Sequence, residues 1–391
     1  MADVAVVGAV NGGRIPDSAE PLRVAQVGDA LDTGGKERVA VNLANGLAAA
    51  GWESHLISTR WEGPMRALVR PEVHAWCGGR RWRFDLRAAK RIADYIADNR
   101  IQIVHTHNHY TAYFMWFVLK FCKVHPLHVV HDHHGPAMGN RLMALADWLM
   151  FRHVDAYIAV SEELQARAKR ILSLSDDRCL YIHNGVEVFP PHEPYQGPPT
   201  VVQVANLSWP KGHDVSVRAA AELRKRFPQL RWVCVGRITE PSDYVAQVKG
   251  LVRSLGMEDC FILAGEQADV RPALRQANVG VIASDTEGLP MAMLEYMVEE
   301  LPVVTTDVGQ CPALVREAGC GLIVPPRQPD QLAEAIAKLL DDPAQARPMA
   351  ARGRRLVEAK FSVAAMVERI SRLYRDLLEG RRRSERPEGE G

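Results

Sequence analysis

The chain has 391 residues, of which 47% are hydrophobic and 24% charged, and its formal net charge is +1. This length suits two domains of roughly 150–200 residues each, and the near-neutral charge argues against nucleic-acid binding as the main task. Seven scattered cysteines form no CxxC pair and no disulfide framework. That pattern is typical of a reducing compartment and predicts a cytoplasmic protein.

The first predicted elements are a strand and a helix that flank a glycine pair. Residues 1–21 lack the basic start of a signal peptide, and we expect them to form a loosely held extension. A strand is predicted at Leu22–Val27 and a helix from about Arg38 to Ala50. Gly34 and Gly35 allow the backbone to approach a ligand closely before a helix N-terminus, as in phosphate-binding loops. Neither the dinucleotide fingerprint nor the P-loop motif occurs.

Short apolar segments then alternate with helical ones up to residue 188. This alternation predicts βαβ units and a parallel sheet, which binds ligands outside the carboxyl ends of its strands. The strands are predicted at Ser54–Ser58, Val73–Trp76, Ile101–His105, His128–His131, Ala156–Val160 and Cys179–Ile182.

Two histidine clusters, His105–His109 and His131–Gly135, fall at the ends of predicted strands. These clusters allow three interpretations. The clusters could bind a metal, because histidine is the commonest transition-metal ligand. They could be polar strand ends that bond to one another, or they could face a bound donor. A metallohydrolase would need the spacing H-x-H-x-D-H, and His109 stands where the aspartate is required.

The segment from Arg60 to Lys123 is basic. It contains twelve basic and five acidic residues, a local charge of +7, and Arg80, Arg81 and Arg83 alternate with Trp82 and Phe84. Such a surface suits an anionic membrane or a lipid-diphosphate acceptor. The alternative is a solvated basic face over an ordinary core helix.

A boundary and a second domain follow. Residues 189–199 contain five prolines, which predicts a stiff linker. Lys211 then lies in a loop after the first strand of the second domain. The strands of this domain are predicted at Thr200–Ala205, Trp232–Val235, Cys260–Leu263, Val279–Ala283, Val303–Thr305 and Leu322–Val324, and a helix at Arg347–Leu378.

A strand-to-helix turn stands out within this second domain. It has a carboxylate at each end, Glu287 and Glu295, and Pro290 suits the first helical position. Between the two carboxylates lie the amides of Gly288 to Met291 at the positive end of the helix dipole. A nucleotide-sugar, with hydroxyls at both ends and phosphates in the middle, matches this arrangement.

The segment E-G-L-P-M-A-M-L-E at 287–295, followed by L-P-V-V-T-T-D-V-G at 301–309, closely resembles the E-x7-E signature of the family 4 retaining glycosyltransferases. Gly-Gly-x-Glu-Arg at 34–38 and the two histidine-rich strand ends resemble further motifs of that family. The resemblance implies an α/β GT-B fold, with two Rossmann-like domains whose parallel sheets face a central cleft. The implied divisions are an extension at 1–21, an acceptor domain at 22–188, a linker at 189–199, a donor domain at 200–360, a helix at 361–379 that returns to the first domain, and a disordered tail at 380–391.

The resemblance also implies residue roles. Glu287, Lys211 and His134 would be catalytic, although the His134 assignment could shift to His133. In the family an arginine precedes the lysine, and here Asn206 occupies its position, so that Arg237 is a candidate substitute. The donor-binding residues implied are Gly34, Gly35, Asn206, Arg237, Gly265, Gly288, Leu289, Pro290, Met291 and Glu295.

These expectations combine into one function. The chain is expected to transfer a sugar, with retention, from a UDP- or GDP-linked donor to a lipid-linked or polysaccharide acceptor in cell-envelope biosynthesis of lipopolysaccharide, capsule or exopolysaccharide. No metal, other cofactor or protein nucleophile is expected, and the location would be cytoplasmic, peripheral on the inner face of the membrane. The alternatives are a GT-B sugar-nucleotide epimerase or phosphorylase, a metal-dependent hydrolase and a non-catalytic binder.

Overall fold

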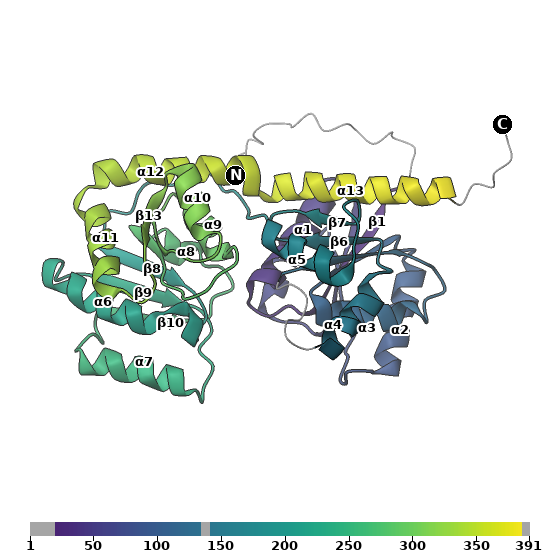
Figure 1. Ribbon diagram of the computed structural model, residues 1–391, viewed down its shortest axis with the longest axis horizontal. Coiled ribbons are helices and arrows are strands. Elements are labelled where there is room, and N and C mark those ends of the chain that lie inside the picture. Colours follow the sequence, from purple (N-terminus) through teal and green to yellow (C-terminus); the bar gives the residue numbers. More distant parts are fainter. Residues whose placement is uncertain (1–19, 134–140, 385–391) are drawn as a thin grey trace, which may run out of the picture.

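The computed structural model describes residues 20–133 and 141–384 and shows two parallel sheets joined by a linker (Figure 1). The first sheet has the strand order β3-β2-β1-β4-β5-β6-β7, and the second has the order β10-β9-β8-β11-β12-β13. Every ladder is parallel, as the alternation of strands and helices predicted. In each sheet the strand order reverses beside the first strand, β1 or β8, which is where ligands bind in such folds.

Strands of the first sheet lie within one to three residues of their predicted bounds. They are buried along most of their length because helices cover both faces of the sheet. The elements are β1 (Arg23–Ala30), α1 (Gly35–Ala49), β2 (Glu53–Trp61), the 3-10 turn Pro64–Leu68, β3 (His74–Cys77), α2 (Leu86–Asp98), β4 (Ile103–His107), α3 (His109–Leu119), β5 (Leu127–Asp132), α4 (Arg141–Phe151), β6 (Ala156–Ala159), α5 (Glu162–Leu172) and β7 (Cys179–Tyr181).

The second sheet is built in the same way and also matches its predicted strands. Its buried apolar residues form one cluster on each face. The elements are β8 (Thr200–Val204), the 3-10 turn Trp209–Lys211, α6 (His213–Arg226), β9 (Arg231–Val235), α7 (Asp243–Ser254), β10 (Phe261–Gly265), α8 (Arg271–Leu274), β11 (Val279–Ile282), α9 (Met291–Val298), β12 (Val303–Thr306), α10 (Cys311–Ala318), β13 (Gly321–Val324), α11 (Pro329–Asp341) and α12 (Pro343–Leu356).

The C-terminal helix returns from the second domain to the first. After α12 the chain forms a π-helical turn at Val357–Phe361, and α13 (Val363–Ser384) then runs along the first domain (Figure 1). Ile370 and Tyr374 of α13 are fully buried in the same cluster as α1 and β1. The chain is thus helical over nearly all of the predicted span 347–378, and the π-helical turn separates α12 from the returning helix α13. The predicted disordered tail from residue 380 is wrong up to Ser384, which is helical.

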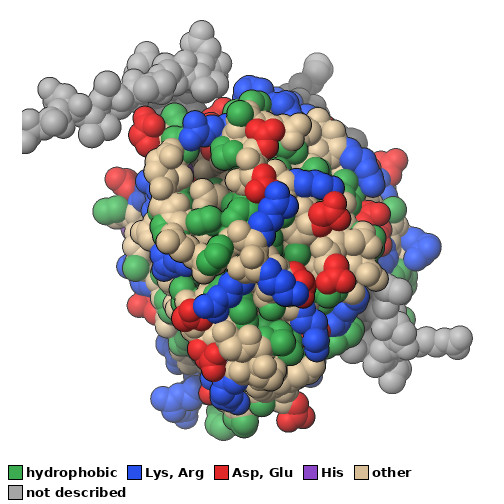
Figure 2. All heavy atoms as spheres, turned by 90° about the vertical axis from the view of Figure 1, so that its left-hand side faces the viewer, with side chains coloured by type: hydrophobic (Ala, Val, Ile, Leu, Met, Phe, Trp, Pro, Cys, Tyr) green, Lys and Arg blue, Asp and Glu red, His purple; other side chains and the backbone are tan. Residues whose placement is uncertain are grey.

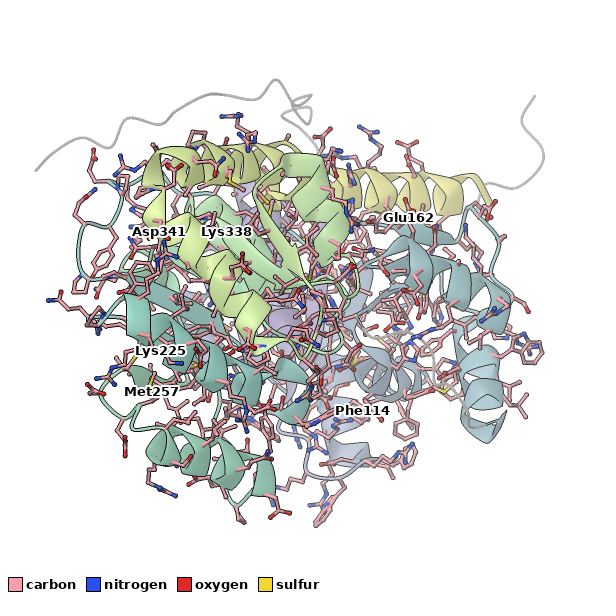
Figure 3. All side chains as sticks on the ribbon, turned by 60° about the vertical axis from the view of Figure 1, so that its left-hand side comes forward. Phe114, Glu162, Lys225, Met257, Lys338 and Asp341 are labelled. Carbon is pink, nitrogen blue, oxygen red and sulfur yellow. The ribbon has the colours of Figure 1, made fainter. Side chains whose placement is uncertain are left out.

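The basic segment is not one continuous surface, because Arg80 is buried. Its guanidinium pairs with Asp29 at 2.7 Å and lies 4.4 Å from the ring centre of Phe114, a residue labelled in Figure 3. Burial lowers the pKa of Arg80, and Asp29 opposes that shift. The expectation that Arg80 is exposed beside Arg81 and Arg83 is therefore wrong.

Pro290 is the N-cap of α9 rather than its first helical residue, and α9 begins at Met291. Within 20–133 and 141–384, no helix combines the length and the apolar character that crossing a bilayer requires. The predicted extension at 1–21 falls outside the described residues up to position 19.

Candidate functional site

A large cleft lies between the two sheets at the carboxyl ends of their strands. It has a cavity volume of about 860 Å³ and is lined from both domains, by the turns before α1 and α9 and by the loops after β6, β8, β9 and β10. The predicted site residues that line it are Gly34, Gly35, Asn206, Lys211, Arg237, Glu287, Gly288, Leu289, Pro290, Met291 and Glu295.

The turn after β11 presents the N-terminus of α9 to the cleft. Pro290 caps this helix without any side-chain hydrogen bond, so that the first amides lack partners and lie at the positive end of the helix dipole. The loop after β12 fixes the turn from behind, because Thr306 Oγ1 donates to the Ser284 carbonyl at 2.6 Å and Gln310 N–H donates to the Gly288 carbonyl at 3.0 Å.

The N-terminus of α1 lies on the opposite wall. Its N-cap, Gly34, also makes no side-chain capping bond. A Cβ on Gly35 would lie 3.4 Å from Met291 Cγ, so the starts of α1 and α9 nearly touch across the cleft. A Cβ at Gly35 would therefore fill the remaining space between the two domains at this point. Two positively polarised helix ends meet at this place.

Lys211 and Glu287 pair directly in this cleft. Lys211 Nζ lies 2.6 Å from Glu287 Oε1, and the same carboxylate oxygen accepts a 2.6 Å bond from Ser284 Oγ. Gln203 Nε2 donates to the Lys211 carbonyl at 2.8 Å, which holds the lysine turn against β8. The structure therefore brings together two residues that lie 76 positions apart and that were predicted separately.

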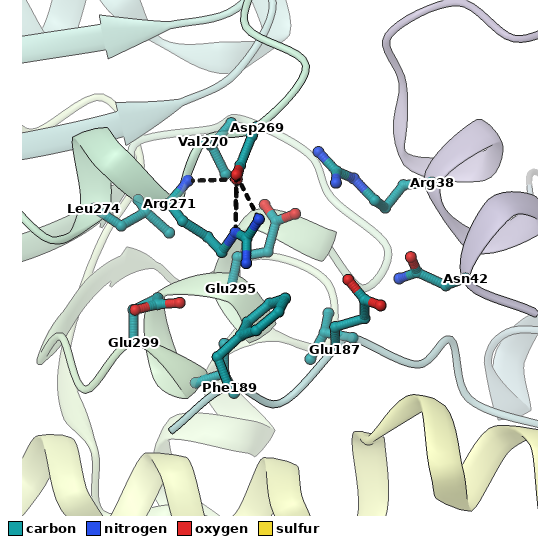
Figure 4. Close-up of a pocket in the computed structure, with 12 residues that line it drawn as sticks. Arg38, Asn42, Glu187, Phe189, Asp269, Val270, Arg271, Leu274, Glu295 and Glu299 are labelled. Atoms are coloured by element: carbon teal, nitrogen blue, oxygen red, sulfur yellow. Dashed lines mark hydrogen bonds and ion pairs between the residues drawn. The ribbon is translucent and has the colours of Figure 1, made fainter. Parts of the chain in front are cut away.

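Glu295 lies where the two domains meet beside α1. A small cavity of about 30 Å³ opens next to it, and Arg38 and Asn42 of α1 face Asp269 and Glu295 across the gap (Figure 4). Burial raises the pKa of Glu295, and the positive charge of Arg38 opposes the shift. Ligand hydroxyls that donate to this carboxylate would stabilise its charged form and lower the pKa again.

Asn206 and Arg237 form a unit at the second-domain wall. Asn206 Oδ1 accepts from the Arg237 backbone N–H at 3.0 Å. The Arg237 guanidinium pairs with Glu266 at 3.0 Å and donates to the Thr33 carbonyl of the first domain at 3.3 Å. The asparagine thus positions the backbone of an arginine that reaches across the cleft. The role of Arg237 as a substitute for the missing family arginine stays a prediction.

Two predicted site residues are not among the described residues that line the cleft. His134 falls outside the described residues, whereas its neighbour His133 lines the cleft. Gly265 ends β10 with a φ of 75° and is not among the lining residues, whereas Glu266 and Gln267 are. Its role is thus to turn the chain rather than to line the cleft.

The metal-dependent hydrolase finds no support in the geometry. His105, His107 and His131 are buried within the first domain and do not line the cleft. A hydrolytic metal must reach its substrate, and these imidazoles lie behind the cleft wall.

Two residues were missed by the sequence analysis. Arg38 Nη2 donates to the Ala268 carbonyl of the other domain, and Ser284 fixes Glu287. Both occur inside segments that had been singled out, the Gly-Gly-x-Glu-Arg motif and the strand-to-helix turn. The residue types and their places in these motifs were the available signal. The Ser284 contact is local to the turn, whereas the Arg38 contact joins the two domains and cannot be seen from neighbours along the chain.

Two family models match adjacent parts of the chain. The model described as Glycosyltransferase Family 4 matches residues 33–188, and the model described as Glycosyl transferases group 1 matches residues 187–356. Together they span most of the sequence. The chain therefore belongs to the family 4 (group 1) glycosyltransferases, as its motifs predicted.

Individual relatives share about a quarter to a third of their residues with this chain. It is 28% identical to Alpha-D-kanosaminyltransferase of Streptomyces kanamyceticus over 46% of both chains. It is 32% identical to D-inositol 3-phosphate glycosyltransferase of Acidothermus cellulolyticus over 56% of this chain and 45% of the relative. These two matches span less than half of each relative. A match of 26% identity covers 74% of this chain and 80% of the Putative glycosyltransferase EpsD of Bacillus subtilis.

Solved structures confirm the fold. Anabaena Alr3699/HepE in complex with UDP-glucose aligns with 91% of this chain and 100% of its own, with a TM-score of 0.77 and 16% identity. Sucrose-phosphate synthase of Thermosynechococcus elongatus aligns with 92% of this chain and 100% of its own, with a TM-score of 0.74 and 21% identity. The predicted GT-B architecture is thus confirmed.

We predict that Gly309→Ala destabilises the turn before α9. Gly309 has a φ of 57°, and a Cβ there would overlap the Glu287 carbonyl and lie 2.7 Å from the Gly288 carbonyl oxygen. The left-handed backbone alone costs about 1–2 kcal/mol with a side chain, which lowers Tm by about 2–4 °C per kcal/mol in domains of this size. Thermal unfolding measures the effect.

The matched control is Gly250→Ala in α7, where a Cβ meets nothing within 4 Å. This variant should be neutral or stabilising by about 0.5–1 kcal/mol, because glycine is unfavourable inside a helix. Equal Tm values for the two variants would show that Gly309 does not support the turn.

Proposed function

We propose that this protein transfers a sugar from a nucleotide-diphosphate-sugar to an acceptor. One observation supports this most strongly. The N-termini of α1 and α9 lack side-chain caps and nearly meet across one cleft, and Lys211 lies beside them. Two helix ends and a lysine together make a site for a multiply charged anion, and a diphosphate is such an anion.

In the proposed cycle, Lys211 changes partners when the donor binds. Its Nζ leaves Glu287 for the diphosphate, and Glu287, still held by Ser284, accepts hydrogen bonds from the sugar hydroxyls. At the other end of the cleft, Glu295 binds the ribose hydroxyls. As the glycosidic bond to the diphosphate breaks, negative charge grows on the departing oxygens. The acceptor hydroxyl bonds to the same face of the anomeric carbon, and its proton passes to the departing diphosphate oxygen. Preorganised amides and a lysine stabilise that charge more in the transition state than in the ground state.

The proposed transfer retains the anomeric configuration and uses neither a metal nor a protein nucleophile. Lys211 and the helix amides supply the positive charge that a divalent cation supplies to diphosphates at other sites. Glu287, the carboxylate nearest to the proposed sugar position, is tied to Lys211 and Ser284. This pairing suits a hydroxyl-binding role better than attack on carbon.

Relatives narrow the proposed substrates. Alr3699/HepE has been solved with UDP and with UDP-glucose, and a similar chain of Mycobacterium tuberculosis is named as a GDP-mannose-dependent mannosyltransferase, so the proposed donor is UDP- or GDP-linked. The names Exopolysaccharide phosphotransferase SCO2592 and Amylovoran biosynthesis glycosyltransferase AmsK belong to similar chains. We therefore propose a glycan or lipid-linked acceptor in polysaccharide biosynthesis.

We further propose that the first domain docks on the inner face of the cytoplasmic membrane. Trp82 and Phe84, which precede α2, are 74% and 65% exposed, and Arg81 and Arg83 beside them are exposed too. The Phe84 ring lies 6.0 Å from that of Phe117 in α3. By contrast, the face of the second domain in Figure 2 intersperses basic, acidic and apolar side chains. Exposed aromatic rings among arginines suit an anionic lipid interface.

The function is tested by incubating the protein with UDP- and GDP-linked sugars and with a lipid-linked or glycan acceptor. We expect release of the nucleotide diphosphate only when an acceptor is present, equal rates with and without EDTA, and an α-linked product from an α-linked donor by NMR. Acceptor-independent epimerisation, phosphorolysis or a β-linked product would contradict the proposal, and so would a requirement for Mn²⁺ or Mg²⁺.

Two variants should separate binding from turnover. Glu295→Gln removes a charged hydrogen-bond acceptor worth about 1.5–3 kcal/mol, which should weaken donor binding about 10- to 100-fold by calorimetry. Lys211→Met should lower kcat by about 10²-fold or more, because the charge that it neutralises grows in the transition state.

The controls are Glu334→Gln in α11 and Lys225→Met in α6, which are exposed and distant from the cleft. Both should behave as wild type. Wild-type kcat in Lys211→Met would remove the lysine from the mechanism and would direct attention to Arg237.

Membrane docking is tested with the double variant Arg81→Glu/Arg83→Glu, which leaves the buried Arg80 in place. Each basic residue near an anionic surface contributes about 1 kcal/mol, so pelleting with anionic vesicles should fall steeply at low salt. The fall should be smaller at high salt, where charges are screened.

Lys225→Glu/Arg226→Glu, on the second domain (Lys225 is labelled in Figure 3), carries the same charge change and should pellet as wild type. Equal pelleting of the two double variants would identify the basic segment as an ordinary solvated face.

A further inference from the structure

Three imidazoles gather inside the first domain, behind the cleft wall. His105 and His107 lie two residues apart on β4, and His131 faces them from β5. The His105 and His107 rings are stacked 4.8 Å apart, and the His131 ring lies 5.2 Å and 5.5 Å from them. One ring nitrogen from each of the three lies within 4.8 Å of the other two.

Several nitrogens of this cluster have no hydrogen-bond partner. They are His105 Nε2 and both ring nitrogens of His131, although both side chains are fully buried. An unsatisfied buried polar atom costs about 1–3 kcal/mol, and native proteins leave few of them. Three such atoms on two neighbouring rings of one buried cluster indicate that the cluster binds something.

The outer nitrogens are oriented by a second set of groups. His107 Nε2 donates to Gln26 Oε1 at 2.9 Å, and Gln26 Nε2 donates to Tyr374 Oη at 3.2 Å. Tyr374 Oη in turn bonds to His105 Nδ1. Histidines that bind metals characteristically hydrogen-bond through the other ring nitrogen to groups of this kind, which fix the ring orientation.

We propose that His105, His107 and His131 bind one divalent transition-metal ion of the class that prefers imidazole, such as Zn²⁺ or Co²⁺. Metal–nitrogen bonds of about 2.0–2.1 Å place ligand nitrogens about 3.4 Å apart, so the rings must close in from their present spacing. Coordination through His105 Nε2 moves the proton of that ring to Nδ1, where it donates to Tyr374 Oη.

His133 completes the site and connects it to the cleft. Its ring stacks on His131 at 4.6 Å, and its Nε2 lies 3.4 Å from His107 Nδ1. His133 also lines the cleft, so it provides the fourth ligand and a route by which the ion enters. The ion then joins β4, β5 and, through Tyr374, the returning helix α13. This role is structural and separate from the proposed transfer, in which no metal takes part.

The test uses the full chain without a polyhistidine tag, produced in medium with added Co²⁺ or Zn²⁺. We expect about one ion per chain by elemental analysis, and visible absorption bands of four-coordinate Co²⁺ in the cobalt-loaded protein. His131→Gln should lose the bands and bind at least tenfold less metal. The matched control is His128→Gln on the same strand, whose Nε2 bonds to Thr106 outside the cluster, and it should retain both.

A second variant covers the case in which His131→Gln does not fold. Tyr374→Phe removes only an outer hydroxyl and should weaken metal affinity about 10- to 100-fold in chelator competition. Wild-type protein that carries only a small fraction of one ion per chain would overturn the proposal. Wild-type metal content in a folded His131→Gln, or unchanged affinity in Tyr374→Phe, would overturn it as well. Metal content is measured without donor or acceptor, so its outcome is independent of the proposed transfer.

Discussion

The two domains are arranged around the N-termini of α1 and α9, whose amides favour a negatively charged partner. Both α1 and α9 begin without a side-chain cap, and each directs its first amides into the same cleft. Free amides at a helix start are normally satisfied by a capping side chain, by water or by a ligand. Because these two starts come from different domains, an anion between them bonds to both at once. Gly35 allows this approach, since a side chain there would occupy the space beside Met291.

The charged groups of the cleft already have partners in the structure. Lys211 pairs with Glu287, Arg237 with Glu266, and Arg38 bonds to the Ala268 carbonyl. Arg38 and Arg237 each bond to a carbonyl of the opposite domain, so polar contacts join the domains at the cleft. A bound ligand can take the place of these partners, because a charged hydrogen bond to the ligand is similar in strength to the one that it replaces.

The returning helix also joins the two domains. Ser362 pairs with Val186 just before the linker, and α13 then buries Ile370 and Tyr374 against α1 and β1. Arg354 Nη1 donates to the Val298 carbonyl at 2.6 Å, and its other terminal nitrogen bonds to the Phe189 carbonyl at the start of the linker. The end of α9, the linker and the last helix are therefore one connected unit. This unit sets the distance between the helix starts at the cleft.

The sequence by itself determined the two parallel sheets, the positions of the strands to within about three residues and the residues of the turn before α9. Those features depend on local patterns: apolar strands that alternate with helices, glycines before helix starts, and two glutamates at a fixed spacing. Only the tertiary structure decided which distant residues meet. The pairing of Lys211 with Glu287 spans 76 residues, and the burial of Arg80 against Asp29 spans 51. The break between α12 and α13 also depends on where the first domain lies. The local sequence pattern does not predict such long-range contacts, because they depend on how the elements of the whole domains pack.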